Sequence, residues 1–322
     1  MVKIYQRIQC GDQLQRTGEK ARDECQRDRT QRSAPLAVAP QLGEHEHRGD
    51  GERREDREGE ADEADQLAEV VRVLGYPVIC KTATSGYDGK GQWTIRTSDE
   101  CAGVEAALRT MTPRGARWIV ESMVNFEREL SVLVICGQDG ERQAYPVAEN
   151  RHEAGILRWS SVPAQIDPSV AARAAALAIQ AVAALESAGV FCVELFQLKG
   201  GTLLVNEIAP RPHNSGHYTL DACTVSQFEQ QVRVLCGLPL GEIRQVTPAC
   251  MVNLIGADLD NTTDPAACRE LLAVPGATLH LYGKRTVRPG RKMGHVTFLA
   301  DTLAKAETRA GQLLQRLGVA NR

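Results

Sequence analysis

The stretch FCVELFQLKGGTLLVNEI, residues 191–208, predicts an antiparallel β-hairpin. Two apolar segments flank Gly200 and Gly201, and a glycine pair between apolar strands is a strong signal for a two-residue hairpin loop. With that loop, residues equally distant from it face each other, so Glu194 lies directly opposite Glu207. Side chains two positions away along either strand share the same face of the sheet. These neighbours are all apolar, namely Cys192, Phe196, Val205 and Ala209.

Two carboxylates that face each other among apolar side chains predict a metal site. Like charges directly opposite each other destabilise a sheet, and burial increases the cost. A divalent cation between Glu194 and Glu207 removes the conflict. Hard oxygen ligands, with Asn206 beside them, favour Mg²⁺, or Mn²⁺ in its place. Two other interpretations stay open: both acids face water on a solvated hairpin, or one of them is protonated.

A polar loop follows the hairpin directly and reads Arg211-Pro212-His213-Asn214-Ser215-Gly216-His217. It places a guanidinium, two imidazoles, an amide and a hydroxyl beside the predicted metal. A guanidinium suits bidentate contact with phosphate-like oxygens. The spacing of His213 and His217 also suits zinc, but no cysteine or acid stands at ligand spacing from them, so we disfavour that interpretation. An ordinary polar turn is the remaining alternative.

A second loop, rich in glycine, lies between predicted strands at 76–81 and 92–96. It reads TSGYDGKGQ, residues 84–92. Its glycines let the backbone approach a ligand closely, and its N–H groups can form an anion-binding nest. Lys90 adds a positive charge, as does Lys81 at the end of the preceding strand. The pattern matches neither the Walker loop nor the dinucleotide-binding fingerprint, and a flexible hairpin loop is the alternative.

Composition excludes several classes of protein. The 322 residues carry 38 basic and 41 acidic side chains, a net charge of −3, which argues against a general nucleic-acid binder. Aromatic residues make up 4% of the chain, too few for base stacking as the main activity. No apolar run reaches the roughly 18–20 residues of a membrane helix. The ten cysteines are scattered without a C-x-x-C pair, which is typical of reduced thiols. We therefore expect a cytoplasmic protein with no nucleic-acid or membrane partner.

The chain changes character near residue 65. Residues 1–64 are polar, and 41–64 contain a single large apolar residue, Leu42. We therefore expect residues 1–64 to be disordered and to form no part of a core. From Asp65 onward, apolar patterns predict hairpins mixed with helices, among them a helix that begins after Asp167. We predict an α+β fold with domains at 65–243 and 244–322.

Five motifs follow one another along the chain. They are Lys81 with 86–92; Glu121 with 126–131; Glu149-Asn150-x-His152; Glu194 with 206–217; and 282–284 with 288–295. In this order they resemble the ATP-grasp fold, and more closely the N5-carboxyaminoimidazole ribonucleotide synthetase family of purine biosynthesis. The resemblance covers roughly residues 66–318. It implies an ATP-grasp core followed by a small β-rich C-terminal domain.

The resemblance implies a site for ATP. Lys81 and the glycine-rich loop would hold the phosphates, through Gly86, Tyr87, Asp88, Gly89, Lys90, Gly91 and Gln92. The strand facing adenine would comprise Glu121, Ser122, Met123 and Val124. Glu129 would bind the ribose hydroxyls and His152 would line the site. Asn206 and Glu207 would contact the nucleotide, with Glu194 and Glu207 as ligands of Mg²⁺.

The resemblance also implies the reaction. Bicarbonate, activated by ATP as carboxyphosphate, would carboxylate 5-aminoimidazole ribonucleotide to N5-carboxyaminoimidazole ribonucleotide. The residues around this centre would be Tyr87, Asp88, Lys90 and Arg211. The ribonucleotide would bind to His213, Asn214 and Ser215, and its 5′-phosphate to Lys284 and Arg291. Taken alone, 284–292 equally suits a solvated basic loop. A homodimer is the assembly that we consider.

Members of this family begin with a nucleotide-fold domain that carries a G-G-G-Q-L-type loop, and residues 1–64 do not match it. We interpret the abrupt change as a frameshift, a misassigned start or a truncated gene product. Two other functions stay open: another ATP-grasp carboxylate–amine ligase, which would lack the 282–295 motif, and a catalytically impaired nucleotide-binding fragment. A scaffolding role of the charged N-terminal tract is a third alternative.

Overall fold

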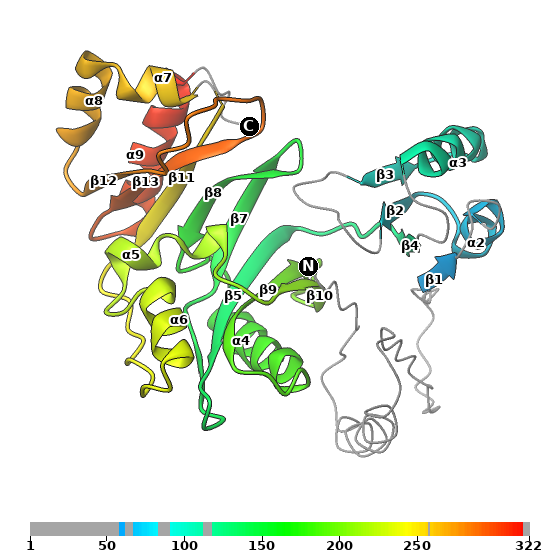
Figure 1. Ribbon diagram of the computed structural model, residues 1–322, viewed down its shortest axis with the longest axis horizontal. Coiled ribbons are helices and arrows are strands. Elements are labelled where there is room, and N and C mark those ends of the chain that lie inside the picture. The colour runs from blue at the N-terminus through cyan, green and yellow to red at the C-terminus, as the bar shows by residue number, and fades with distance from the viewer. Residues whose placement is uncertain (1–57, 62–66, 83–90, 112–117, 257, 318–322) are drawn as a thin grey trace.

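Two sheets organise the chain in the computed structural model, which describes residues 58–61, 67–82, 91–111, 118–256 and 258–317 (Figure 1). Four described strands form a small sheet in the order β1-β4-β2-β3. Nine form a large sheet whose main path runs β10-β9-β5-β7-β8-β11-β13-β12. None of the described helices is long and apolar enough to span a membrane. The predicted disorder of 1–57 and the predicted contacts of Gly86, Tyr87, Asp88, Gly89 and Lys90 lie outside the described residues.

The small sheet and two helices form one apolar core near the N-terminal end of the described chain (Figure 1). Its strands are β1 (Glu58–Ala61), β2 (Val78–Thr82), β3 (Gln92–Ile95) and β4 (Trp118–Ser122). Helices α2 (Leu67–Leu74) and α3 (Ser98–Met111) pack on it through buried Leu67, Val71, Val104 and Leu108. Strands β2 and β3 pair antiparallel, which confirms the hairpin predicted on either side of the glycine-rich loop.

Strand β1 corrects the N-terminal domain boundary. Residues 58–61 pair antiparallel with β4, with Glu58 opposite Glu121 in the register, whereas the sequence analysis placed them in a tract outside the core. A strand at the edge of a sheet is held by its backbone hydrogen bonds, and these need no apolar side chain. The first predicted domain therefore includes residues 58–61 and does not start at residue 65.

The large sheet carries a helix on each of its faces. Its central strands are β5 (Arg128–Cys136), β7 (Ala148–Glu153), β8 (Ile156–Val162), β9 (Gly189–Gln197) and β10 (Leu203–Ala209), with β6 (Arg142–Ala144) paired to β5. Helix α4 (Pro168–Ala183) packs on one face against Val132, Val134 and Val193, and α6 (Gln227–Leu235) packs on the other against Leu133 and Ile135. The side chain of Asp167 accepts a hydrogen bond from the Ser169 amide and caps α4, as predicted.

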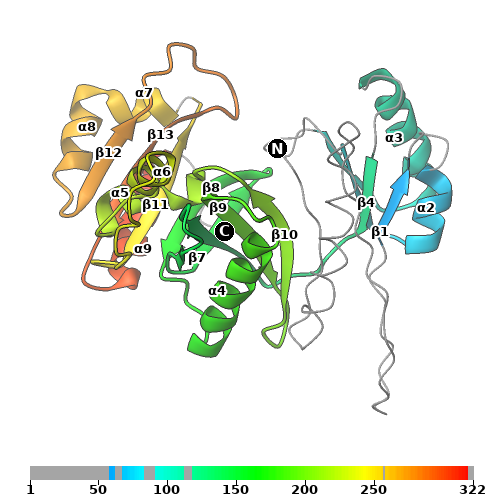
Figure 2. The ribbon, with the colours of Figure 1, turned by 60° about the horizontal axis from the view of Figure 1, so that its bottom comes forward.

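The C-terminal segment continues the large sheet and does not form a sheet of its own. Strand β11 (Ala249–Ile255) pairs with β8, and β13 (Lys292–Leu299) and β12 (Ala277–Leu281) follow it outward. Helices α8 (Pro265–Leu272) and α9 (Leu303–Arg316) cover these strands through a core that includes Val252, Phe298 and Leu314. Figure 2 shows these helices and α7 (Asp258–Thr263) gathered at this end of the molecule.

Candidate active site

The sequence predicts correctly that Glu194 and Glu207 lie opposite each other in the β9–β10 pair, although its reason was wrong. The Leu198 amide donates to the Thr202 carbonyl at 2.8 Å, so the loop holds three residues, 199–201, and not two. A bulge at Asn206 then shifts the register back by one residue. Because the longer loop and the bulge offset each other, the two glutamates face each other as predicted.

The same bulge corrects the predicted position of Val205. This residue pairs with Leu195 in the register and packs in the apolar cluster beneath α4. Val205 therefore lies on the face of the sheet opposite to Glu194. The prediction from the sequence, which put both residues on one face, is wrong for Val205. Cys192 and Ala209 stay on the glutamate side and are fully buried, so the apolar surroundings that predicted a metal site remain.

The electrostatics of the glutamate pair fit a divalent cation. Burial, and after it the neighbouring charge of Glu207, raises the pKa of Glu194 to about 7. The neighbouring negative charge therefore disfavours the ionised form of Glu194. A hard cation with oxygen ligands reverses this effect and holds both groups as carboxylates. The donor set that this chain offers at Glu194 and Glu207 therefore suits Mg²⁺.

A second acidic group lies on the same face of the sheet. Glu129 on β5 contacts His152 on β7, with 2.8 Å between Glu129 Oε2 and His152 Nδ1. Burial lowers the pKa of His152, but the hydrogen bond to Glu129 and the charges of Glu129 and Glu194 together raise it above its ordinary value. The structure thus brings the predicted ribose ligand and the predicted nucleotide-site histidine together beside the glutamate pair.

The polar loop lies beside this face, and its residue His213 contacts Glu194. The Nε2 atom of His213 lies 3.2 Å from Glu194 Oε1. The buried amide of Gln227 fixes the backbone of His213, since Gln227 accepts from the His213 amide at 2.8 Å and donates to its carbonyl at 2.7 Å. Burial, and next the charge of Arg211, lowers the pKa of His213 to about 3. These surroundings favour the neutral form of the His213 imidazole.

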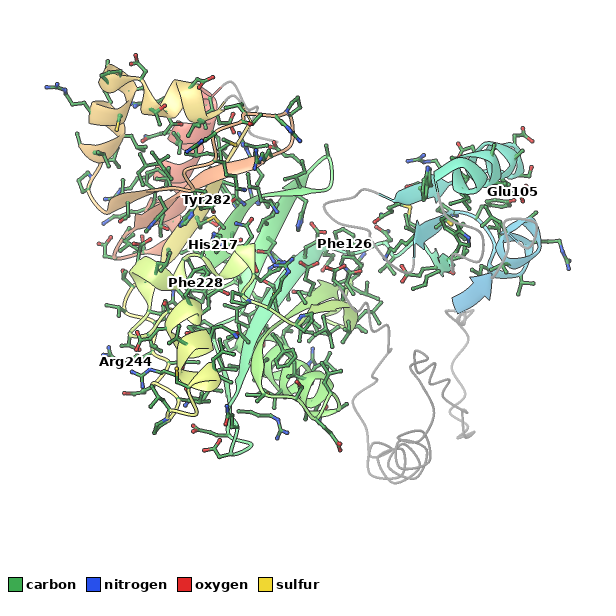
Figure 3. The ribbon with its side chains drawn as sticks, viewed as in Figure 1. Glu105, Phe126, His217, Phe228, Arg244 and Tyr282 are labelled. Atoms are coloured by element: carbon green, nitrogen blue, oxygen red, sulfur yellow. The ribbon has the colours of Figure 1, made fainter. Side chains whose placement is uncertain are left out.

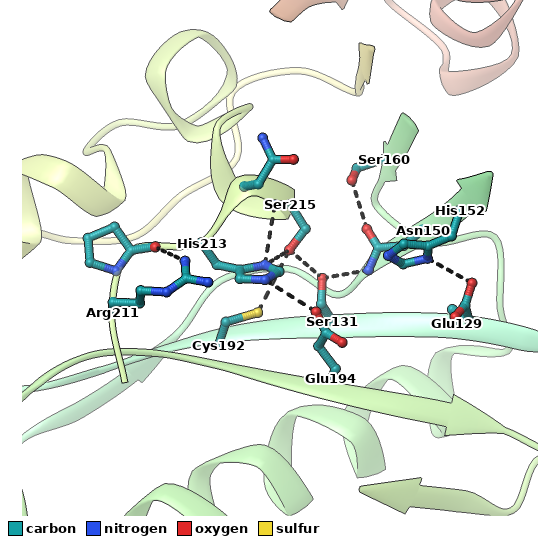
Figure 4. A network of polar contacts seen from close by, with 12 residues as sticks. Glu129, Ser131, Asn150, His152, Ser160, Cys192, Glu194, Arg211, His213 and Ser215 are labelled. Carbon is teal, nitrogen blue, oxygen red and sulfur yellow. Dashed lines mark hydrogen bonds and ion pairs between the residues drawn. The ribbon is translucent and has the colours of Figure 1, made fainter. Parts of the chain in front are cut away.

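The other loop residues divide between the surface and the interior. Arg211 is exposed, and its guanidinium donates to the Pro212 carbonyl at 3.0 Å. Asn214 and Asn253 on β11 exchange reciprocal amide hydrogen bonds of 2.9 and 2.6 Å, which tie the loop to the C-terminal strands. Ser215, in the short helix η2 (Asn214–Gly216), is buried, and its hydroxyl contacts Ser131 and His213 (Figure 4).

The C-terminal strands add an aromatic and basic border to the site. The Tyr282 hydroxyl lies 2.8 Å from His217 Nδ1 and 2.9 Å from His295 Nδ1, and Figure 3 shows Tyr282, His217 and Phe228 in one column. Lys284 donates to the Lys292 carbonyl at 2.5 Å. After burial, the charge of Lys292 is the next largest cause that lowers the pKa of His217, to about 4. Lys292, the first residue of β13, is therefore close enough to act on the His217 ring.

The predicted adenine-facing residues begin on the last strand residues of β4, Glu121 and Ser122, and continue into the connection after it. Lys81 on β2 and Glu121 on β4 form an ion pair of 2.5 Å between Nζ and Oε2, with both side chains largely buried. Met123 follows β4 in the connection to the large sheet, and its amide donates to the Pro77 carbonyl at 3.0 Å. The nucleotide residues predicted from the sequence thus divide between two sheets: Lys81, Gln92 and 121–124 on one side, and the glutamate pair with Glu129 and His152 on the other (Figure 1).

No role was predicted for three polar residues behind the site, Ser131, Asn150 and Ser160, although Ser131 and Asn150 stand in the second and third motifs. All three are buried on strands of the large sheet. A signal was present, because Ser131 follows Glu129 at the two-residue spacing of one strand face. It was overlooked because a single serine in an apolar strand is common. Lys292 and Tyr282 were also given no role, although both stand in the fifth motif.

A cluster of Asp221, His280 and His295 offers ligand atoms within 4.8 Å of one another. It does not suit a metal as it stands, because the rings of His280 and His295 are stacked 4.4 Å apart with 14° between their planes. A ligated ion lies in the plane of each imidazole that binds it, so two stacked rings cannot both reach one ion. His280 instead pairs with Asp221 at 2.9 Å.

The loop also depends on a glycine, which gives a prediction for stability. A Cβ atom at Gly216 would lie 2.3 Å from Leu133 Cδ1 and 2.9 Å from Gln227 Oε1, both of which belong to buried residues. We expect Gly216→Ala to lower the free energy of unfolding by about 1–3 kcal/mol through overpacking. The control is Gly103→Ala in α3, where a Cβ meets nothing within 4 Å, and which should stabilise the protein by about 0.5–1 kcal/mol. Equal effects of the two substitutions in urea unfolding would contradict the packing of this loop.

The comparisons with known proteins agree with this geometry. Residues 59–228 match the model of the ATP-grasp domain, and residues 249–309 match that of the phosphoribosylaminoimidazole carboxylase C-terminal domain. The N5-carboxyaminoimidazole ribonucleotide synthase of Bacillus subtilis is 44% identical over 235 residues, which is 73% of this chain and 59% of that protein. This chain thus spans about three fifths of the length of that relative.

Solved structures give the same picture. The N5-carboxyaminoimidazole ribonucleotide synthetase of Thermus thermophilus is similar at a TM-score of 0.69 and 41% identity, covering 82% of this chain and 68% of that one. The synthase of Aspergillus clavatus, in complex with ADP and 5-aminoimidazole ribonucleotide, has a TM-score of 0.71 and 33% identity, with 82% and 68% covered. The chain therefore belongs to the ATP-grasp family, in the branch of the N5-carboxyaminoimidazole ribonucleotide synthases.

Proposed function

We propose that this chain carboxylates 5-aminoimidazole ribonucleotide with bicarbonate and ATP, in the cytoplasm and as a step of purine biosynthesis. The observation that carries the proposal is the pair of opposed carboxylates, Glu194 and Glu207, on the face that also holds Glu129, His152 and the loop of His213. Binding of ADP and 5-aminoimidazole ribonucleotide by the Aspergillus relative supports the choice of substrates. A homodimer is the proposed assembly.

Most of the chemical work of these residues is electrostatic. Bicarbonate attacks the γ-phosphorus of ATP, the bond to the β-phosphate oxygen breaks, and carboxyphosphate and ADP result. Carboxyphosphate then releases phosphate and transfers CO₂ to the exocyclic amine of the ribonucleotide. Arg211, exposed at the edge of the site, offsets the charge of the transferring phosphoryl group. Mg²⁺ held by Glu194 and Glu207 supplies Lewis-acid stabilisation of the same charge.

The basic loop after β12 selects the ribonucleotide. Lys284 and Arg291, both half-buried, are fixed by hydrogen bonds to the carbonyls of Lys292 and Thr286, and their charges suit a phosphate monoester. Another ATP-grasp ligase would bind ATP in the same way without needing this loop. The proposed function therefore includes the C-terminal strands in the substrate site.

Replacement of either loop cation should weaken ribonucleotide binding selectively. A charge-assisted hydrogen bond contributes roughly 1.5–3 kcal/mol, so we expect Lys284→Ala and Arg291→Ala each to raise the KM for 5-aminoimidazole ribonucleotide by roughly 10- to 100-fold. The KM for ATP should stay unchanged. Arg316→Ala, which removes an exposed cation on α9, is the control. If the KM for ATP rises instead, the basic loop belongs to another site.

The function itself is tested with ¹³C-bicarbonate, ATP and 5-aminoimidazole ribonucleotide. We expect one ADP and one labelled carbamate carbon for each ribonucleotide consumed. The carbamate carbon is detected by ¹³C NMR. Omission of bicarbonate should stop ADP formation. Formation of ADP with formate or an amino acid in place of bicarbonate would instead favour another ATP-grasp ligase.

A further inference from the structure

A chain of four hydrogen bonds runs through buried side chains behind the active site (Figure 4). Ser160 Oγ on β8 donates to Asn150 Oδ1 at 2.7 Å, and Asn150 Nδ2 donates to Ser131 Oγ at 2.9 Å. Ser131 Oγ donates to Ser215 Oγ at 2.8 Å, which in turn lies 2.9 Å from His213 Nδ1. The four residues before His213 are at most 5% exposed. The chain ends at the imidazole that faces Glu194.

The direction of this chain follows from one backbone group. The Ser215 amide N–H donates to His213 Nδ1 at 3.4 Å, and a backbone amide can only donate. The Nδ1 atom is therefore an acceptor without a proton of its own, so the Ser215 hydroxyl must donate to it as well. The Ser215 oxygen is then free to accept from Ser131, and from the Cys192 thiol at 3.7 Å.

The donors and acceptors of Ser131, Asn150 and Ser160 are consistent with this direction. Ser131 donates to Ser215 and accepts from the Asn150 amide nitrogen, and the Asn150 amide oxygen accepts from Ser160. Each group uses donors and acceptors that it has. The one arrangement that satisfies these hydrogen bonds leaves Nδ1 of His213 unprotonated and places the ring proton on Nε2, the atom 3.2 Å from Glu194 Oε1.

We propose that Ser215, Ser131 and Asn150 are positioning residues that hold His213 in its Nε2–H tautomer, with this N–H aimed at the carboxylate of Glu194. The opposite tautomer would turn a nitrogen lone pair toward the carboxylate oxygen. A donor beside a carboxylate that binds a metal fixes the orientation of that carboxylate, and such partners outside the ligand set are common in metal sites. The tautomer is inferred from contacts alone, and its effect on the metal rests on the proposed function.

The first test needs no activity and no metal. In the full-length chain labelled with ¹⁵N-histidine, at pH 7 and without ligands, the two ring nitrogens of His213 are observed by NMR and assigned from their loss in His213→Gln. We expect Nε2 at the shift of a protonated nitrogen and Nδ1 at that of an unprotonated one. Averaged shifts, a proton on Nδ1, or a doubly protonated ring would each overturn the proposal, whatever the activity of the chain.

Variants then test whether the hydrogen bonds from Ser160 to His213 cause the preference of His213 for the Nε2–H tautomer. Ser215→Ala removes the hydroxyl donor, and we expect the tautomer ratio to move toward Nδ1–H by roughly fivefold, the factor that one neutral hydrogen bond contributes. Ser131→Ala should move it in the same direction, and Ser131→Thr, which keeps the hydroxyl, should restore it. The matched control is Ser161→Ala. Ser161 is buried, as Ser160 is, and its hydroxyl donates to Glu307, which is not part of the hydrogen-bond network that ends at His213.

In an active preparation, the same variants separate a positioning role from a packing role. Ser215→Ala and Ser131→Ala should lower kcat by roughly 10-fold, the lower end of the range for a partner behind a metal ligand. In Ser131→Ala, whose side chain is assigned no substrate contact, the KM for the ribonucleotide should stay unchanged. An unchanged His213 spectrum in both alanine variants, or an equal shift in Ser161→Ala, would overturn the proposal. If the spectra change as expected but no variant or wild-type chain forms ADP, the proposed function fails and the tautomer assignment stands.

Discussion

Glu207→Gln and Glu194→Gln should each reduce Mg²⁺-dependent ATP turnover by at least about a hundredfold, because each removes one of two charges that hold the cation. The fold should survive. Relief of the repulsion between two opposed, largely buried carboxylates should raise the free energy of unfolding by about 0.2–1 kcal/mol. Activity should therefore fall while stability rises, as expected for a functional site whose charges destabilise the fold. Phosphate release and urea unfolding on the same preparations measure both.

The control for this pair is Glu141→Gln. Glu141 is exposed in the turn between β5 and β6, so its charge has no bearing on the active-site face. We expect its turnover and its unfolding midpoint to match those of the unsubstituted chain. Full ATP turnover in Glu194→Gln or Glu207→Gln would contradict the assignment of these residues as metal ligands. A lower free energy of unfolding in either variant would show that protein groups already stabilise the two carboxylates.

Asp258→Asn should destabilise the chain by about 3 kcal/mol, the lower end of the cost of breaking a buried ion pair, because Glu153 Oε2 still lies 3.7 Å from Arg158 Nε. Arg158 on β8 is 4% exposed and forms an ion pair with Asp258 at the start of α7. Its guanidinium also donates to the Asn253 carbonyl at 3.1 Å, and Asp258 accepts from the Ile255 amide at 2.8 Å. The pair joins the two segments that match separate family models, so its loss should loosen β11 from β8.

Hydrogen exchange and urea unfolding measure this effect, with Glu270→Gln as the control. Glu270 forms an exposed pair with Arg316, and exposed pairs contribute about 0–1 kcal/mol. We expect faster amide exchange in β8 and β11 for Asp258→Asn and no change for Glu270→Gln. Equal unfolding free energies for the two variants would show that Arg158 keeps its charge solvated, and would contradict the burial of this pair.

The hairpin shows how far local sequence rules reach. Apolar alternation and a glycine pair are local signals, and they placed Glu194 opposite Glu207. The three-residue loop and the bulge at Asn206 appear only in the pairing of β10 with β9, whereas the prediction assumed a two-residue loop and a regular register. The two effects offset each other at the glutamates but not at Val205, which is why the pair was predicted correctly and its neighbour was not.

Other features could not be predicted because they depend on pairing between distant residues. Strand β1 has no apolar pattern, and only its register against β4 makes it a strand. The C-terminal segment was predicted as a second domain, but nothing in its sequence shows that its strand β11 pairs with β8 and extends the large sheet. The chain from Ser160 to His213 joins residues from β8, β7, β5 and the polar loop, none of which is unusual alone.

The most direct test of the central claim is Mn²⁺ binding measured by electron paramagnetic resonance in the presence of ADP. Mn²⁺ prefers the same oxygen ligands as Mg²⁺ and is visible to this method. If Glu194 and Glu207 hold the cation, the unsubstituted chain and Glu141→Gln bind Mn²⁺ with the same affinity, while Glu194→Gln and Glu207→Gln bind it at least about tenfold more weakly. Equal Mn²⁺ affinity in all four chains would contradict the assignment of the opposed carboxylates as the metal site.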